Sequence, residues 1–358
     1  MSAAPLLFVT GHVPAYRVGA FAELHEREGI ELALFGGRSQ HGGAEAEGEL
    51  PFPSTRASPA AIAALAARGG HRAVIASTGG RLALPAAWAG ARAGRRPLLL
   101  WASLWAHPRS AAHAIGYLPM RRLYRSADAV ITYGPHVSAY VRRHGARNVH
   151  EAPQAVDNAF WTATATPRPG AGVRFLFAGR DAPEKGLGVL LEAWRQAALE
   201  GASLGLAGAG LDRAGAGTDG VRALGPLAPA GLRDAYAASD VLVVPSIATP
   251  TFREPWGLVV NEAMNAGLAV IASDAVGAAA GGLVRDGETG LVVPAGDSGA
   301  LAGAITRLAH DAALRERLGA AARLGVSAYT YAAWAQGFSK ALSTLGLARA
   351  QSSLPRRV

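Results

Sequence analysis

The chain has 358 residues, 50% of them hydrophobic and 17% charged, which is long enough for two domains with separate cores. It contains no cysteine, so disulfide bonds and thiolate metal sites are excluded, as is usual in a reducing cytoplasm. The sequence lacks both the roughly 18–20 apolar residues that span a bilayer and the pattern of a signal peptide. We therefore expect a soluble, cytoplasmic protein.

The formal net charge is +9, and the first 160 residues hold most of the excess, with 17 arginines against 10 acidic residues. Such an excess attracts nucleic acid, an anionic membrane surface or an acidic substrate. No helix-turn-helix, zinc-finger or RNP motif accompanies it, so we expect no nucleic-acid partner. Two interpretations stay open: the arginines bind an anionic partner, or they only reflect the composition of the chain. They form three clusters: Arg92/Arg95/Arg96, Arg121/Arg122/Arg125 and Arg142/Arg143/Arg147.

Short apolar runs alternate with helical patterns along the first half of the chain. The helical patterns include residues 18–28 and 59–70. The apolar runs, which have the length of buried strands, cover residues 5–10, 31–35, 73–77, 97–103 and 129–133. Strands that alternate with helices predict an α/β fold with a parallel sheet covered on both faces.

A stretch of small residues, proline and glycine at 162–172 has no periodicity and is typical of a linker. The alternation then restarts, with a helix expected over 186–200 and another after Pro255. The apolar runs of this half cover residues 173–179, 203–208, 241–246, 268–273 and 290–295. Two α/β domains in tandem predict a ligand in the cleft between them, at the carboxyl ends of the strands.

The segment "GRDAPEKG" follows the first strand of the second half and carries Arg180 and Lys185. Lys185 is one of two lysines in a chain that otherwise uses arginine, which hints at a need for a compact point charge. Together the two cations could clamp a diphosphate. The alternative is an exposed pair near a helix start, where the helix dipole opposes cations and some anion should compensate.

The segment "FREPWGLVVNEAM" places Glu254 before, and Glu262 within, a predicted helix that begins near Gly257. Glu254 can accept hydrogen bonds from hydroxyl groups, and Glu262 can chelate a vicinal diol such as that of a ribose. An anion can bind the N–H groups that open the helix, those of Gly257, Leu258 and Val259. The two carboxylates on either side of the helix start match the sugar, diphosphate and ribose of a nucleotide-sugar. In isolation, the segment would equally be explained by one helix-capping glutamate and one surface glutamate.

The joint pattern of "GRDAPEKG", "EPWGLVVNE" and "MNAGLAVIASDAVGAAAGGLVRDGETGLVVPAGD" resembles the retaining, nucleotide-sugar-dependent glycosyltransferases of family 4. The resemblance implies the GT-B fold, in which two Rossmann-like domains face each other across a cleft. It assigns 1–161 to an acceptor-binding domain and 173–327 to a donor-binding domain. Residues 328–358 would form a closing helix that crosses back to the N-terminal domain, "YAAWAQGFSKAL", and then a tail.

The same resemblance implies roles for single residues. Arg180 and Lys185 would hold the donor diphosphate, Glu254 the sugar hydroxyls and Glu262 the ribose. His107 is the candidate for a catalytic histidine close to the donor sugar.

The sequence departs from the family pattern at the first loop, where many members have a glycine pair and this chain has Gly11 and His12. Gly11 is still expected to bind the donor. No D-x-D motif occurs, and Asp286-Gly287-Glu288 is typical of a turn, so we expect no metal and no cofactor besides the donor itself.

The resemblance implies transfer of a hexose-type sugar from a UDP- or GDP-linked donor to an acceptor, with retention of anomeric configuration. The basic N-terminal half favours a lipid-linked or anionic acceptor and peripheral contact with the inner face of the membrane; a soluble metabolite is the rival. Two alternatives stay open: a nucleotide-sugar 2-epimerase on the same scaffold, and a catalytically degenerate partner subunit. The sequence leaves open the sugar, the base, the linkage, the pathway and the oligomeric state.

Overall fold

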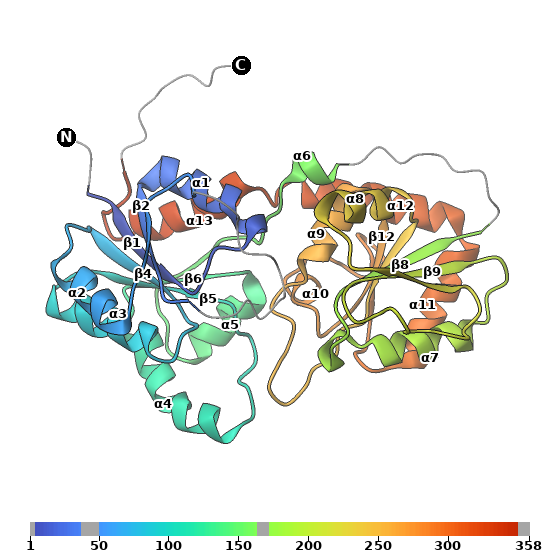
Figure 1. Cartoon of the computed structure of the whole chain (residues 1–358), viewed down its shortest axis with the longest axis horizontal. Coiled ribbons are helices and arrows are strands. Elements are labelled where there is room, and N and C mark those ends of the chain that lie inside the picture. The colour runs from blue at the N-terminus through green and yellow to red at the C-terminus, as the bar shows by residue number, and fades with distance from the viewer. Residues whose placement is uncertain (1–3, 37–49, 163–171, 350–358) are drawn as a thin grey trace, which may run out of the picture. The chain divides into compact units, whose positions relative to one another are not determined.

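The computed structural model describes residues 4–36, 50–162 and 172–349, and these residues form two compact units (Figure 1). The first unit consists of the chain up to Ser103, Ala114–Gln154 and the chain from Tyr331 onward. The second unit consists of Leu104–His113 and Ala155–Thr330. Within the described ranges no helix is both long and apolar enough to cross a membrane.

The first unit is built on a parallel sheet in the order β3-β2-β1-β4-β5-β6-β7. Its strands are β1 (Leu6–Thr10), β2 (Ile30–Leu34), β3 (Ser54–Arg56), β4 (Ala73–Ser77), β5 (Leu98–Ala102), β6 (Ala129–Thr132) and β7 (Val149–Glu151). The central strands β1, β5 and β6 are buried along their whole length. This burial on both faces explains why the sequence shows continuous apolar runs there.

The helices of this unit cover the sheet. They are η1 (Ala15–Arg17), α1 (Val18–Glu28), α2 (Pro59–Arg68), α3 (Ala83–Ala93), most of α4 (Ala111–Ser126), α5 (Pro135–Arg143) and α13 (Tyr331–Ser343). Helix α2 begins where the Ser58 side chain accepts a hydrogen bond from the N–H of Ala61, with Pro59 in the first turn.

The last helix, α13, belongs to the first unit and packs beside α1. A Cβ atom at Gly19 of α1 would lie 2.3 Å from the Tyr331 ring, so glycine permits the close approach of the two helices. The rings of Phe21 and Trp334 meet edge to face at 5.4 Å between centroids, and the core of the unit is therefore partly aromatic.

The second unit repeats the design with a parallel sheet in the order β10-β9-β8-β11-β12-β13. Its strands are β8 (Arg174–Ala178), β9 (Ser203–Ala207), β10 (Val221–Gly225), β11 (Val241–Val244), β12 (Ala269–Ser273) and β13 (Leu291–Val293). Both sheets thus have the doubly wound order of Rossmann-like domains. The order in which successive strands are added to the sheet reverses between β1 and β4 in the first unit and between β8 and β11 in the second. Ligands bind at such switch points in this class of fold.

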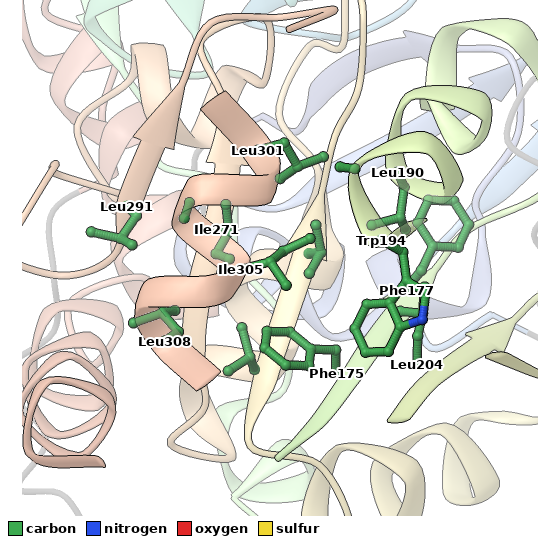
Figure 2. Packing of buried hydrophobic residues seen from close by; sticks show 14 of the residues in the cluster. Phe175, Phe177, Leu190, Trp194, Leu204, Ile271, Leu291, Leu301, Ile305 and Leu308 are labelled. Atoms are coloured by element: carbon green, nitrogen blue, oxygen red, sulfur yellow. The ribbon is translucent and has the colours of Figure 1, made fainter. Parts of the chain in front are cut away.

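The helices of the second unit are α6 (Asn158–Trp161), η2 (Pro183–Lys185), α7 (Leu187–Ala197), α8 (Pro229–Ala237), α9 (Leu258–Asn265), α10 (Gly277–Ala280), α11 (Ser298–His310) and α12 (Ala312–Val326). Figure 2 shows α7 and α11 packed with the sheet through Trp194, Phe175 and Ile305. Each such side chain contributes about 1.5–3 kcal/mol when it is fully buried.

The sequence-based ranges put the first domain at 1–161 and a linker at 162–172. Residues 163–171 of that linker lie outside the described residues. Helix α6, which the first range includes, packs on α9 in the second unit.

Three edge strands, β3, β7 and β10, were not predicted. They lie at the ends of the two sheets, and none of their residues is buried. Because none of their residues is fully buried, they lack the apolar run that revealed the central strands.

Candidate functional site

The predicted diphosphate loop follows β8 at the reversal point of the second sheet. Gly186 has φ +69°, and a Cβ atom there would lie 2.0 Å from the carbonyl oxygen of Pro245, just after β11. The N–H of Ile247 donates to the carbonyl of Glu184 at 2.9 Å. The loops after β8 and β11 are therefore held against each other, and glycine is required at position 186.

The two cations of this loop each have a carboxylate partner. Lys185 Nζ lies 2.5 Å from Glu254 Oε2, and both side chains are largely buried. Arg180 is more exposed and donates to Glu184 Oε1 at 2.7 Å, four residues later in the same loop. The anions that compensate these two cations are thus Glu184 and Glu254. The structure brings Lys185 and Glu254, two of the predicted site residues, together.

The segment that carries Glu254 is fixed by its backbone. Glu254 and Val276 form a parallel bridge, and the N–H of Gly277 donates to the Glu254 carbonyl at 3.1 Å. A Cβ atom at Gly277 would lie 2.0 Å from the carbonyl oxygen of Pro255, so only glycine allows this contact. The Glu254 carboxylate is therefore presented from a rigid position, as a site that orients a ligand requires.

Helix α9 begins after Gly257, which has φ +90° and lies in the left-handed region that favours glycine. Leu258 and Val259 form the first turn, and the N–H of Val260 donates to the carbonyl of Gly257 at 3.0 Å. The first N–H groups of a helix have no partner inside it, and the helix dipole makes its start positive. The geometry agrees with the helix start that the sequence predicted.

Glu262, on the second turn of α9, is buried and accepts a hydrogen bond from the hydroxyl of Tyr236 at 2.8 Å. Burial raises the pKa of Glu262 to about 7, against the opposing effect of the Tyr236 hydrogen bond. Tyr236 lies on α8, where the Trp161 ring packs edge-on against it. One carboxylate oxygen therefore has a protein partner, and the group titrates near neutral pH.

His107 lies in the stretch Leu104–His113, which packs with the second unit. Trp105 anchors this stretch: its Nε1 donates to the Glu254 carbonyl at 3.0 Å, and the Arg253 guanidinium lies 4.5 Å from its ring. His107 Nε2 lies 3.0 Å from the carbonyl oxygen of His113, so that nitrogen carries a proton and donates. The stretch with His107 is thus tied to the segment with Glu254.

Gly11 lies in the first unit, after β1, and its carbonyl accepts from the N–H of Gly36 at 3.0 Å. A Cβ atom there would lie 3.4 Å from the Gly36 oxygen, which is close to ordinary contact, and the backbone does not lie in the left-handed region. Local backbone geometry therefore does not require glycine at this position.

Sequence reasoning missed three residues. Tyr236 and Trp105 were not singled out because their partners, Glu262 and Glu254, are distant in sequence. Arg17 was missed as well: its guanidinium is buried, donates to Gln154 Oε1 and lies over three aromatic rings, those of Tyr16, Trp101 and Tyr133. Its position between the first strand and the first helix was the available signal.

The described ranges contain no group of three or more histidine, aspartate or glutamate side chains that could hold a metal ion. The Asp286-Gly287-Glu288 sequence forms a turn, as predicted, with Asp286 Oδ1 accepting from the N–H of Val292 at 2.9 Å and Glu288 paired with Arg285.

Comparison with known proteins bears first on the second unit. Residues 172–311 match the family described as Glycosyl transferases group 1. A curated relative, the phosphatidyl-myo-inositol mannosyltransferase of Mycobacterium leprae, is 37% identical over 185 residues, which are 49% of this chain and 48% of the relative. The chain thus spans about half the length, or less, of the first curated relatives it matches.

Solved structures match almost the whole chain. Sucrose-phosphate synthase from Thermosynechococcus elongatus has a TM-score of 0.76 at 22% identity, with 96% of this chain and 99% of that chain covered. The Anabaena protein HepE in complex with UDP-glucose has a TM-score of 0.72 at 19% identity, with 95% and 99% covered. At these identities the matches establish the fold, which is the GT-B fold that the sequence predicted.

Proposed function

We propose that this protein is a glycosyltransferase that moves a hexose from a UDP- or GDP-linked donor to an acceptor. The observation that carries the proposal is the pairing of Lys185 with Glu254 at the carboxyl end of β8, in the part of the chain that matches group 1 glycosyl transferases. Sugar transfer needs a cation for the leaving diphosphate and a carboxylate for the sugar. This unit holds both side by side.

Donor binding exchanges partners within this pair. A diphosphate brings negative charge to Lys185, whose three N–H donors can turn from Glu254 to the phosphate oxygens. Glu254 is then free to accept hydrogen bonds from the sugar hydroxyls. Arg180 is partly exposed and pairs with Glu184 of the same loop. It can reorient toward the phosphates at small cost, because such surface pairs contribute at most about 1 kcal/mol.

The remaining donor contacts follow the order of the ligand. The start of α9, with the N–H groups of Gly257, Leu258 and Val259, faces the negative charge of the diphosphate. Glu262 accepts from the ribose hydroxyls through the oxygen that Tyr236 does not use. Charge on the departing diphosphate is met by cations and helix N–H groups, without a metal ion.

His107 and Gly11 are the two remaining residues of the proposal. His107 is proposed to act at the donor sugar. Its loop is held next to the Glu254 segment because Trp105 Nε1 donates to the Glu254 carbonyl. Gly11 lies in the first unit and is proposed to bind the donor, and the same unit is proposed to bind the acceptor. Retention of anomeric configuration rests on the family resemblance.

The acceptor is proposed to be anionic and lipid-linked. The first unit contains most of the excess of arginine over acidic residues. The matching relative from M. leprae is named for a phosphatidyl-myo-inositol acceptor, a lipid that carries a phosphate. The reaction is proposed to take place in the cytoplasm, at the inner face of the membrane.

The proposal is tested by incubating the protein with UDP-glucose, UDP-galactose and GDP-mannose, with and without vesicles that contain phosphatidylinositol. The expected result is release of UDP or GDP and a new glycolipid whose anomeric configuration, read by NMR, equals that of the donor. An epimerised donor without a conjugate would indicate the 2-epimerase, and an inverted anomer would refute retention. Failure of every donor to bind would leave only a partner-subunit role.

A further inference from the structure

Helix α4 (Ala111–Ser126) exposes two large apolar side chains on its solvent face. Ile115 is 80% exposed and Leu118 is 69% exposed, and both belong to the small set of large hydrophobic residues that the described surface leaves uncovered. They are three positions apart, so they lie side by side on the helix. Apolar side chains that are exposed together, rather than singly, mark surfaces that contact a protein or a membrane.

The same face of α4 becomes basic one turn later. Arg122 and Arg125 are exposed and follow Leu118 by four and seven positions, which places them in line with it along the helix. The apolar half and the basic half thus form one stripe, and α4 contains no acidic residue at all.

The surroundings of α4 add to the charge. Residues 111–147 hold six arginines and a single acid, Asp128, whose carboxylate already accepts from the N–H of Leu98 at 2.8 Å. None of the six arginines forms an ion pair with a carboxylate in the part of the chain that the structure describes. The positive charge of this surface is therefore not neutralised by the protein.

The inner face of α4 fixes the direction of the exposed stripe. Tyr124 is buried, with its ring edge-on to Tyr140 of α5 at 6.4 Å, and Tyr117 packs edge-on against His144 at 5.4 Å. These contacts lie on the side of the helix opposite Ile115 and Leu118. The stripe is therefore held outward on a packed helix. Figure 1 shows where α4 lies in the first unit.

We infer that α4 docks this protein on an anionic membrane surface. Ile115 and Leu118 enter the boundary between head groups and acyl chains, while Arg122 and Arg125 contact lipid phosphates. Long arginine side chains can reach the head groups while the helix lies in the plane of the surface. The unpaired positive charge favours an anionic membrane as the partner. A protein partner is disfavoured because two apolar side chains alone are too few for a stable protein interface.

Docking itself does not depend on sugar transfer, but its consequence rests on the proposed function. If the acceptor is lipid-linked, α4 holds the first unit at the surface where the acceptor lies. The residues proposed to bind the sugar donor, by contrast, do not lie on α4. Donor binding and membrane binding can therefore be measured separately.

The test uses the full chain and vesicles of phosphatidylcholine with graded fractions of phosphatidylglycerol, at low and at high salt. The wild-type protein is expected to sediment with anionic vesicles and to be partly released by salt. The double variant Ile115→Ser/Leu118→Ser should reduce partitioning by about tenfold or more. The double variant Arg122→Gln/Arg125→Gln should also bind less and lose much of the salt dependence.

Matched controls come from the second unit. Leu324 on α12 is 77% exposed, so Leu324→Ser removes an equally exposed apolar side chain elsewhere. Arg222→Gln/Arg307→Gln removes two exposed arginines in the same way. Both controls should sediment like the wild type, and thermal melting should show every variant folded.

Three outcomes would overturn the inference. The wild type could ignore anionic vesicles at low salt, or the α4 variants could bind as well as the controls. Alternatively, Ile115→Ser/Leu118→Ser could convert an oligomer to a monomer in sedimentation velocity without changing vesicle binding, which would make the stripe an interface between copies. Titration of UDP and GDP in the absence of vesicles reports on the proposed function alone, so either proposal can fail without the other.

Discussion

The two units share one strand order, yet they hold charge differently at the carboxyl ends of their strands. In the second unit Lys185 and Glu254 form a close ion pair, and Arg180 pairs with Glu184. In the first unit Arg17 is buried over aromatic rings and has no carboxylate partner within the described ranges. The second unit thus holds paired charges that can exchange partners, whereas the first unit holds a positive charge that is fixed in place.

The difference follows from what each unit must bind in the proposed reaction. A donor leaves as a charged nucleotide after each turnover, and ion pairs that can trade partners allow its charge to come and go. A buried guanidinium held by rings cannot trade partners so easily, because its contacts are mostly to faces of aromatic groups. The following experiments break or sharpen this comparison, starting with the largest expected effect.

Glu254→Gln should lower turnover by about 100-fold or more, because the proposed partner of this carboxylate is the sugar on which charge develops. Binding of UDP should change far less. Steady-state kinetics at saturating donor, with free UDP affinity measured by calorimetry, checks both quantities. Glu262→Gln is the matched variant, and it should mainly raise the KM for the donor. If Glu262→Gln abolishes turnover and Glu254→Gln does not, the two roles are reversed.

Lys185→Ala should weaken binding of the donor and of free UDP or GDP alike, by about 1.5–3 kcal/mol, since the lost contact is to phosphate. The change also leaves the Glu254 carboxylate without its cation in a largely buried place. Lys340→Ala is the natural control, because Lys340 is the other lysine of the chain and lies exposed on α13. If the Lys185→Ala protein binds UDP and GDP as tightly as the wild type does, Lys185 does not hold the diphosphate.

Arg17→Ala and Arg180→Ala compare the two ways of holding charge directly. The first loses three ring contacts and a buried hydrogen bond, so it should reduce the free energy of unfolding by about 2–3 kcal/mol. The second loses a partly exposed ion pair within one loop and should cost less than about 1 kcal/mol. Urea titration followed by tryptophan fluorescence measures both. If both variants lose the same free energy of unfolding, the contacts of Arg17 stabilise the fold no more than those of Arg180.

The sequence predicted the central strands, the GT-B fold and the start of α9, because buried strands and helix entries leave local patterns. It also marked Lys185 through the rarity of lysine. It could not predict that Lys185 pairs with Glu254, since the two residues are 69 positions apart and meet only because β8 and β11 are neighbours. The burial of Arg17 and the exposure of Ile115 likewise depend on tertiary packing, which leaves no periodic trace.

The smallest effect concerns Glu262 and pH. Because burial raises its pKa to about 7, the carboxyl group loses its proton within the neutral range. Ribose hydroxyls donate hydrogen bonds to the ionised form, so UDP affinity should rise severalfold between about pH 6 and 8. Tyr236→Phe removes the hydrogen bond that lowers this pKa, and should move the rise in affinity to higher pH.

Stability should change with pH in the opposite direction. The folded-state pKa of Glu262 lies above the unfolded value of 4.5, so between these values the folded state binds more protons than the unfolded state. Its contribution to the free energy of unfolding therefore falls as the pH rises from about 4.5 to about 7. Glu262→Gln cannot titrate, so it should flatten both the affinity and the stability profiles over this range. Calorimetric titration of UDP and urea unfolding, each across pH 5 to about 8, compare the two proteins. If UDP affinity in the wild type is independent of pH there, Glu262 does not bind the ribose in its ionised form, and that contact must be assigned to another group of the second unit.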